Sequence, residues 1–215
     1  MSWFSRGTAS RREQASKAAA VTAVENEPEA HRSLALPAFF AALARSPKPN
    51  VLDLGAALGS NVERLSEFGC KLFIEDLYES KKSAGEGGSL SPQFFTEFLA
   101  PPAGTQFDFV LAWDLFDYLS RKELAALGAR LRATCRPGAL VFALTSIHKT
   151  IPAQPIRFRF QGQDQLIYER RSTIERPGPR FAPAELNAAL QGFRVDRSFL
   201  LRHGIQEYLF VREGA

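Results

Sequence analysis

Short apolar runs recur along the middle of the chain, and each has the pattern of a β-strand that is buried on both faces. They lie at 51–54, at 71–74, at 107–113 ("FDFVLAW") and at 139–146 ("ALVFALTS"). Continuous apolar runs of this length are typical of parallel strands covered by helices on either side. The pattern therefore predicts a parallel sheet in the middle of the chain.

Between these runs, apolar residues recur at three- and four-residue spacing, which is the pattern of an amphipathic helix. Val62, Leu65 and Phe68 lie on one such face, and Gly69 ends that helix. Ser91, followed by a proline, is a typical beginning for another helix. A Gly/Ser loop is expected at 80–91, and helices are expected at 29–46, through 62–68, and at 92–99, 120–135 and 182–193.

The pattern changes after Thr150. "IRFRF" (156–160) and "QLIYERR" (165–171) alternate around "QGQD" like the strands of a β-hairpin, and 194–201 and 206–212 alternate around "RHG". The whole pattern predicts an α/β fold with a doubly wound, mostly parallel sheet and a C-terminal antiparallel strand pair, in three α/β/α layers.

The composition is that of one globular domain of ordinary size. The chain has 215 residues, 45% of them hydrophobic, and no apolar run approaches the roughly 18–20 residues that a membrane span needs. Cys70 and Cys135 lie far apart without metal-ligand spacing, which indicates free thiols in the cytoplasm and no metal site. The 27 basic and 23 acidic residues are scattered, which disfavours nucleic acid as a partner but leaves it open.

The first 28 residues are expected to form a flexible tail, and 29–215 a single domain with a hairpin insertion around 156–171. The beginning of the chain is rich in Ser, Ala and Arg and poor in acids, which is also the composition of an organellar transit peptide. It has no secretory hydrophobic region. We interpret it as a mobile bacterial tail that leads into a helix.

The segment "VLDLGAALGSN" at 51–61 places an acid and two glycines on the turn from the first strand into a helix. Gly55 and Gly59 allow the backbone to approach a ligand closely, and Asp53 offers carboxylate oxygens beside the turn. One strand later, Glu75 and Asp76 follow at the carboxyl end. An acid about 20 residues beyond such a turn is well placed to bind two ribose hydroxyls. The pattern predicts a nucleoside site.

A dinucleotide site is one alternative at this turn. Its fingerprint, G-x-G-x-x-G, places a pyrophosphate on the helix N-terminus. Here the middle position is Ala57 and the last is Ser60, and Asp53 would repel a phosphate. A ligand with a cationic amino-acid end would instead be attracted by Asp53. Because the fingerprint does not match and Asp53 would repel the pyrophosphate, a nicotinamide-dependent oxidoreductase is disfavoured.

Four segments, "VLDLGAALGSN", "LFIEDLYE", "FDFVLAWDLFDYL" and "RPGALVFAL", resemble in their order the class I S-adenosylmethionine-dependent methyltransferases of the type 11 kind. The resemblance covers about 31–215, including the antiparallel last two strands. It implies S-adenosylmethionine as the cofactor, with Asp76 favoured over Glu75 at the ribose. The cofactor-binding residues that it implies are Asp53, Gly55, Ala57, Gly59, Glu75, Asp76, Asp114 and Leu115.

The chain departs from that family in two places. Ala57 stands where the family has its middle glycine. The gap between Asp76 and Phe107 is short for a full helix plus a third strand, so the strand that normally holds the adenine ring is expected to be reduced or missing. Glu97 is the candidate for an adenine contact, but the sequence does not assign it.

The methyl acceptor has no motif of its own in this sequence. Methyl transfer from a sulfonium is an in-line displacement that depends mainly on alignment, and a base is needed only when the acceptor must lose a proton. The Pro-Pro-aromatic motif of amino-methylating nucleic-acid enzymes is absent after the fourth strand, and there is no Pro-Cys nucleophile. A small-molecule acceptor is therefore expected, and no catalytic residue is assigned.

Four side chains near strand ends are candidates for the acceptor site, and each has a structural alternative. His148 is a general base, an acceptor ligand or an ordinary polar loop residue. Asp117 and Tyr118 contact the acceptor or cap and pack a helix. Trp113 flanks the cofactor base or belongs to the core. The structural alternative is favoured for each.

The hairpin and the segment after it are the expected lid over the acceptor. Arg170, Arg171 and Arg176 could recognise an anionic acceptor, but a solvated edge strand protected by charge is the favoured interpretation. His31 and His203 have no evident partners and are expected to be structural. A degenerate scaffold that has lost cofactor binding stays open as a second function, since fold does not fix function.

Overall fold

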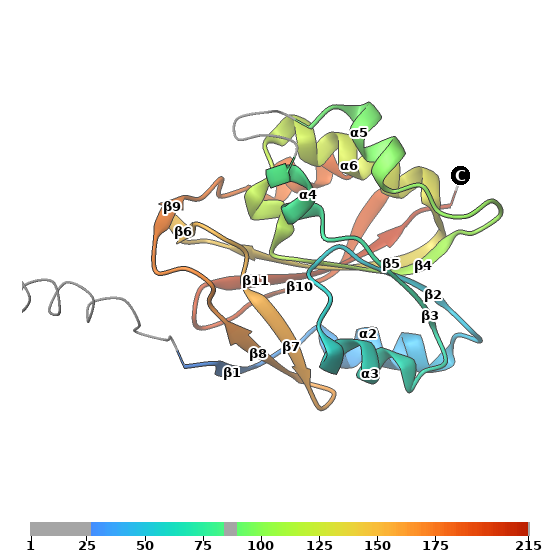
Figure 1. Ribbon diagram of the computed structural model, residues 1–215, viewed down its shortest axis with the longest axis horizontal. Coiled ribbons are helices and arrows are strands. Elements are labelled where there is room, and N and C mark those ends of the chain that lie inside the picture. Colours follow the sequence, from blue (N-terminus) through green and yellow to red (C-terminus); the bar gives the residue numbers. More distant parts are fainter. Residues whose placement is uncertain (1–26, 84–89, 215) are drawn as a thin grey trace, which may run out of the picture.

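The structure, a computed structural model, describes residues 27–83 and 90–214 and is organised around a six-stranded sheet (Figure 1). Its strand order is β10-β11-β5-β4-β2-β3. Strands β3, β2, β4 and β5 run parallel, and β11 pairs antiparallel with both β5 and β10. The predicted fold class is confirmed. The strands are β2 (Asn50–Asp53), β3 (Lys71–Ile74), β4 (Phe107–Trp113), β5 (Cys135–Ser146), β10 (Phe193–Leu200) and β11 (Ile205–Arg212).

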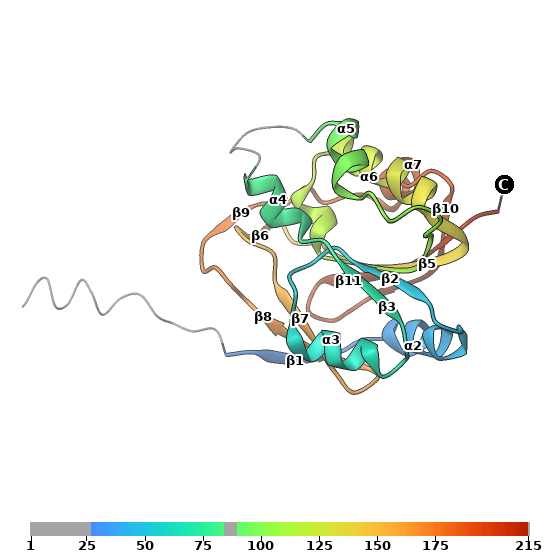
Figure 2. The same ribbon diagram turned by 45° about the vertical axis from the view of Figure 1, so that its right-hand side comes forward.

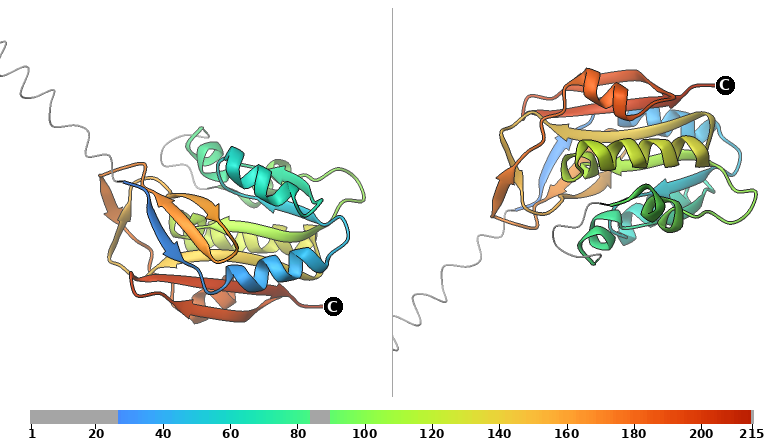
Figure 3. Two further views of the ribbon diagram at one scale, coloured as in Figure 1. Left: turned by 90° about the horizontal axis from the view of Figure 1, so that it is seen from below. Right: turned by 90° about the horizontal axis from the view of Figure 1, so that it is seen from above.

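Helices cover both faces of this sheet and give the molecule three layers (Figures 2 and 3). Helices α2 and α3 lie on one face, and α4, α5, α6 and α7 lie on the other. Val51 of β2 packs in the same cluster as Phe39 of α2, whereas Leu52 packs with Leu127 of α6. This two-sided burial is why the strands are continuously apolar. The helices are α2 (Leu36–Arg45), α3 (Gly59–Ser66), α4 (Leu77–Ser83), α5 (Pro92–Phe98), α6 (Arg121–Thr134) and α7 (Pro183–Ala189).

A smaller sheet in the order β1-β8-β7 packs beside α3, at the carboxyl end of the parallel strands (Figure 1). Strands β7 (Arg157–Gln161) and β8 (Gln165–Glu169) form the expected hairpin. Strands β6 (Thr150–Pro152) and β9 (Glu175–Pro177) pair antiparallel beside it. These segments lie over the end of the sheet where ligands bind in doubly wound folds.

The helix expected at 29–46 is wrong in its first part. Residues Glu29–Arg32 form strand β1, which pairs antiparallel with β8, and the helix begins only at Leu36. The free backbone N–H groups of Leu34 and Ala35 donate to the carboxylate of Glu207 in β11, at 2.7 and 2.9 Å. The partners that shape this segment come from the far end of the chain, so its local pattern could not reveal them.

The loop expected at 80–91 is partly wrong, because α4 extends through Ser83, and 84–89 lie outside the described residues. Helix α4 is held by Lys81, whose Nζ lies 2.8 Å from the buried carboxylate of Glu123. Within the described residues, β3 is the edge of the main sheet, and α4 and α5 lie where a further strand would follow. The expected loss of that strand agrees with this arrangement.

The helix expected at 120–135 ends at Thr134, and Cys135 and the "RPG" at 136–138 already belong to β5. Of the expected N-terminal tail, 1–26 lie outside the described residues, and Glu27 and Pro28 are exposed. Within the described part of the chain, the helices are too short or too polar to cross a membrane.

Candidate functional site

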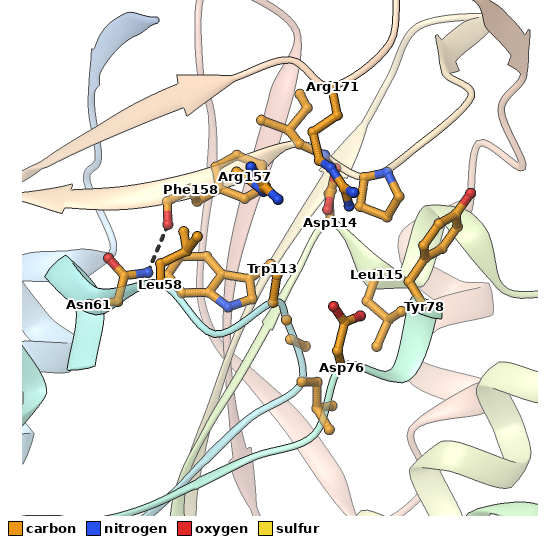
Figure 4. A pocket seen from close by; sticks show the side chains of 16 residues that line it. Leu58, Asn61, Asp76, Tyr78, Trp113, Asp114, Leu115, Arg157, Phe158 and Arg171 are labelled. Carbon is orange, nitrogen blue, oxygen red and sulfur yellow. Dashed lines mark hydrogen bonds between the residues drawn. The ribbon is translucent and has the colours of Figure 1, made fainter. Parts of the chain in front are cut away.

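A narrow cleft of about 40 Å³, open to solvent, lies at the carboxyl ends of β2, β3 and β4 (Figure 4). Its floor is formed by the turns that follow these three strands, and its roof by the segment that enters β7. This is the place predicted for the cofactor. The lining includes Gly55, Leu58, Asp76, Tyr78, Trp113 and Asp114.

Asp53 lies beneath this cleft and does not line it. Its Oδ1 accepts hydrogen bonds from the backbone N–H of Gly55 at 2.9 Å and from the indole Nε1 of Trp113 at 2.6 Å. The side chain is 2% exposed, and burial raises its pKa to about 6. The sequence predicted that the carboxylate of Asp53 lies beside the ligand. In the structure this carboxylate lies outside the cleft and stabilises the turn through its hydrogen bonds to Gly55 and Trp113.

Trp113 forms a wall of the cleft, directly over Gly55. Its backbone is left-handed, with φ of 50°, and its ring stacks on Phe158 of β7 with centroids 5.6 Å apart. A Cβ at position 55 would lie 2.6 Å from the indole Cδ1. Trp113 is therefore a buried core residue that also lines the cleft, and its contact with the cofactor base stays a prediction.

Of the two acids at the end of β3, Asp76 lines the cleft and Glu75 does not. The Oδ1 of Asp76 accepts the backbone N–H of Glu79 at 3.1 Å in the first turn of α4. Partial burial raises the pKa of Glu75. Ala57 and Gly59 are exposed and lie outside the lining, while Leu115 belongs to it.

Asp114 follows β4 and is almost fully buried, with 7% of its surface exposed. Its Oδ2 accepts the backbone N–H of Ile156 at 3.0 Å, which ties the segment before β7 to the end of the main sheet. Burial, assisted by the nearby Asp117, raises the pKa of Asp114 to about 8. This carboxyl can therefore hold or release a proton near neutral pH.

Two arginines in the roof bring positive charge to the cleft. Arg157 and Arg171 both line it (Figure 4). A guanidinium nitrogen of Arg157 lies 3.7 Å from the carboxylate of Glu169, and one of Arg171 lies 3.7 Å from that of Glu79. The sequence had singled out Arg171 but not Arg157. Arg157 was missed because an alternating sequence pattern shows that a strand has two different faces, but not which face lines a cleft.

Asn61 is a residue that the sequence analysis missed. It is buried in α3, its Nδ2 donates to the carbonyl of Phe158 at 2.8 Å, and its Oδ1 accepts the N–H of Phe160 at 3.0 Å. A polar amide on the apolar side of a helix, four residues before Leu65, was the available signal. It joins the first turn of the fold to the roof.

A second, larger cavity of about 310 Å³ adjoins the cleft, and Asp114, Ile156 and Phe158 line both. It brings together three histidines that are far apart in the sequence. The rings of His31 and His203 stack with centroids 4.0 Å apart, and Nε2 of His148 lies 3.0 Å from the backbone oxygen of His203. His31 and His203 thus have partners that the sequence did not reveal.

Asp117 and Tyr118 lie in the short 3-10 helix η1 (Leu115–Tyr118) and also line this cavity. The Oδ2 of Asp117 accepts the N–H of Ser146 at 2.7 Å, and the Tyr118 hydroxyl lies 3.0 Å from the carbonyl oxygens of Pro152 and Gln154. Burial raises the pKa of Asp117 to about 7. Both side chains pack the fold and face the cavity.

The other lid arginines lie at the same end of the molecule. Arg176 lies over the ring of Tyr118, with the guanidinium carbon 5.5 Å from the centroid. Arg170 lines the second cavity, and its Nη1 is 3.7 Å from the carboxylate of Glu175. These charges belong to the lid of both hollows. Glu97 lies on α5 and lines neither of them.

Comparison with known proteins adds to this geometry. No protein-family model and no curated protein matches the chain. A solved S-adenosylmethionine-dependent methyltransferase from Clostridium acetobutylicum superposes with a TM-score of 0.53 and 11% identity, over 95% of this chain and 98% of that one. The chain has a methyltransferase fold. At this identity the likeness concerns the fold alone.

A second solved structure supports the same conclusion about this methyltransferase fold. The PH0226 protein from Pyrococcus horikoshii superposes with a TM-score of 0.50 and 13% identity, over 83% of this chain and 88% of that one. Both superpositions include most of each chain. The likeness of fold therefore extends over most of this chain.

Proposed function

We propose that this protein is a cytoplasmic S-adenosylmethionine-dependent methyltransferase that acts on a small molecule. The observation that carries the proposal is the cleft at the carboxyl ends of β2, β3 and β4, where Asp76, Asp114 and the Gly55 turn meet in a methyltransferase fold. Ligands of doubly wound folds bind at this end of the sheet.

The polar groups around the cleft fit the ends of S-adenosylmethionine. The carboxylate of Asp76 suits the two ribose hydroxyls, and the guanidinium groups of Arg157 and Arg171 suit the α-carboxylate. Asp53 would act from outside the lining, by holding the turn in place.

The remaining proposed contacts come from the backbone near the first turn. Gly55 lines the cleft directly, and Leu115 offers an apolar surface on the other side. Ala57 and Gly59 shape the turn into α3 without lining the cleft. Ala56 and Leu58 line the cleft beside Gly55, so a ligand would touch several residues of this turn.

When bound, the sulfonium supplies an electrophilic methyl carbon. The protein's task is to align it with the acceptor and to exclude water, and orientation alone lowers such barriers by several kcal/mol. Trp113 and Phe158, stacked at the wall of the cleft, supply a dry and rigid surface. The larger cavity next to the cleft has room for a small acceptor.

Calorimetric titration of the full chain with S-adenosylmethionine and its demethylated product tests the proposal. We expect micromolar binding, weakened about tenfold or more in Asp76→Asn, since one charge-assisted hydrogen bond contributes roughly 1.5–3 kcal/mol. The asparagine keeps an oxygen for the N–H of Glu79, so that α4 stays capped.

Glu75→Gln is the matched control, because this neighbouring acid lies outside the lining and its loss should change the affinity less than about twofold. Equal effects of the two substitutions would contradict the assignment of Asp76. Heat released with a nicotinamide dinucleotide, but not with S-adenosylmethionine, would favour an oxidoreductase instead.

A scaffold without cofactor binding is the second candidate, and Trp113 is the observation that favours it. The indole covers Gly55 and occupies the hydrogen-bonding oxygen of Asp53, where the family resemblance places the amino-acid end of the ligand. If neither the wild type nor Trp113→Ala binds S-adenosylmethionine or its demethylated product in the same titrations, the scaffold function is supported. Binding by Trp113→Ala alone would show that the indole closes a site that is otherwise intact.

A further inference from the structure

We infer that the second cavity binds a small organic amine as the methyl acceptor, and that Asp114 is the base that takes its proton. This inference rests on the proposed function and assigns a substrate class and a catalytic residue to it. It is carried by the position of Asp114, by unpaired polar atoms in the cavity wall and by the charge of the lining.

Asp114 lies on the wall between the two hollows. Together with Ile156 and Phe158 it lines both the cleft proposed for the cofactor and the larger cavity. A methyl donor in the first and a nucleophile in the second would therefore meet beside this carboxyl. Its Oδ2 is held by the N–H of Ile156, which fixes its orientation.

The wall of the cavity carries buried polar atoms that have no partner among the described residues. They are Oδ1 of Asp117 and the hydroxyl of Tyr168, in side chains that are 3% and 7% exposed, and Nε2 of His203. Leaving such a group unpaired typically costs about 1–3 kcal/mol. These atoms have almost no surface of their own open to the cavity, so a ligand that donates N–H bonds would reach them only after their side chains rotate.

The charge of the lining favours a cation. Among the described lining residues, the carboxylates of Glu27 and Glu29 and the carboxyl groups of Asp114 and Asp117, whose pKa values burial raises to about 8 and about 7, lie with one guanidinium, that of Arg170. Burial and the neighbouring His31 lower the pKa of His203, which favours its neutral form. The aromatic rings of the lining, those of Tyr118, Phe158 and Tyr168, suit an ammonium group and an apolar body.

The chemistry balances with these groups alone. A protonated amine gives one proton to the carboxylate of Asp114, and its freed lone pair forms a bond to the sulfonium methyl carbon. The carbon–sulfur bond breaks with its electrons on sulfur, so that a thioether and a methylated ammonium leave. Burial raises the pKa of Asp114 to about 8, which narrows the gap to the pKa of an alkyl amine, about 10.

The binding test uses three probes of one shape on the full chain: phenethylamine, phenethyl alcohol and phenylacetate. We expect the amine to bind about tenfold or more tightly than the alcohol, and phenylacetate not to bind. Asp117→Asn should weaken the amine about tenfold. Asp164→Asn, an exposed acid in the hairpin turn outside the cavity, is the matched control and should leave the affinity unchanged.

The catalytic test follows methyl transfer to phenethylamine by mass spectrometry. Asp114→Asn keeps an oxygen for the N–H of Ile156, and we expect kcat to fall about 100-fold, within the usual contribution of a general base, with a smaller change in KM. The wild-type rate should rise with pH toward 8, whereas the variant should lose that dependence.

The outcomes separate this inference from the proposed function. If S-adenosylmethionine binds but the amine does not, or if phenylacetate binds better, the amine assignment is overturned and the cofactor proposal stands. If the amine binds but S-adenosylmethionine does not, both the methyl transfer and the role of Asp114 are overturned. Full activity of Asp114→Asn with an unchanged pH profile would overturn the base alone.

Discussion

At the scale of single residues, the contact between Trp113 and Gly55 shows why the first turn contains a glycine. The φ of Gly55 is not left-handed, so backbone conformation does not demand glycine there. Glycine is required because the indole of Trp113 lies too close: its Cδ1 is less than 3 Å from the position that a Cβ of residue 55 would take. The same indole donates to Asp53 at 2.6 Å and cannot move without breaking that bond.

We predict that Gly55→Ala destabilises the protein by about 1–3 kcal/mol, which is the usual cost of overpacking a core. Urea unfolding measures the change. Gly59→Ala is the matched control, since a Cβ there meets nothing within 4 Å and alanine is a better helix residue by about 1 kcal/mol. If Gly55→Ala is as stable as the wild type, the indole of Trp113 can shift to accommodate a Cβ, which would contradict the prediction.

At the scale of secondary-structure elements, Asn61 fastens the roof of the site to the main fold. Strand β7 is an edge of its sheet, and its outer backbone groups at Phe158 and Phe160 would be unpaired. The amide of Asn61 satisfies both, as a neighbouring strand would. One side chain thus closes an open edge and joins α3 to the hairpin.

We predict that Asn61→Leu lowers the free energy of unfolding by about 2–4 kcal/mol, since it leaves two buried backbone groups unpaired at about 1–3 kcal/mol each. Hydrogen exchange should show faster exchange at the amide of Phe160. Ser60→Ala, at the exposed neighbouring position, is the control and should have little effect. Unchanged protection of Phe160 would contradict the role given to Asn61.

At the scale of the whole molecule, buried acids gather at the carboxyl end of the sheet and make stability depend on pH. Burial raises the pKa of Asp53 to about 6, of Asp117 to about 7 and of Asp114 to about 8. Such an acid holds its proton more tightly when folded, so its contribution to stability falls as pH rises from the unfolded pKa to the folded one. His203, whose pKa is lowered from 6.5, acts in the opposite direction, and its effect ends slightly above that value.

We predict that Asp114→Asn becomes more stable relative to the wild type as pH rises from 6 to 8, by at most about 1.4 kcal/mol per pH unit. Above the folded pKa the difference should stay constant. Melting temperatures of both proteins from pH 6 to 9 measure it, and groups common to both cancel in the difference. Asp164→Asn should show no such trend; a constant offset for Asp114→Asn would contradict its raised pKa.

The sequence alone determined the main sheet, most of the helices and the end of the sheet where the site lies. A parallel strand that is buried on both faces has a continuous apolar run in its sequence. A helix that is buried on one face has apolar residues at three- and four-residue spacing. Ser91 and Ser120 begin helices because their side chains accept local N–H groups. These signals are local, and they are visible in the chain before it folds.

Only the tertiary structure decided how the site is built. Glu207 caps the segment before α2, Trp113 covers Asp53, and His31 meets His203, in each case across most of the chain or between separate strands. Local periodicity records which face of an element is buried, but not which distant side chain packs against it. The burial of Asp53 and the cavity beside Asp114 arise from such distant contacts, and no local pattern could predict them.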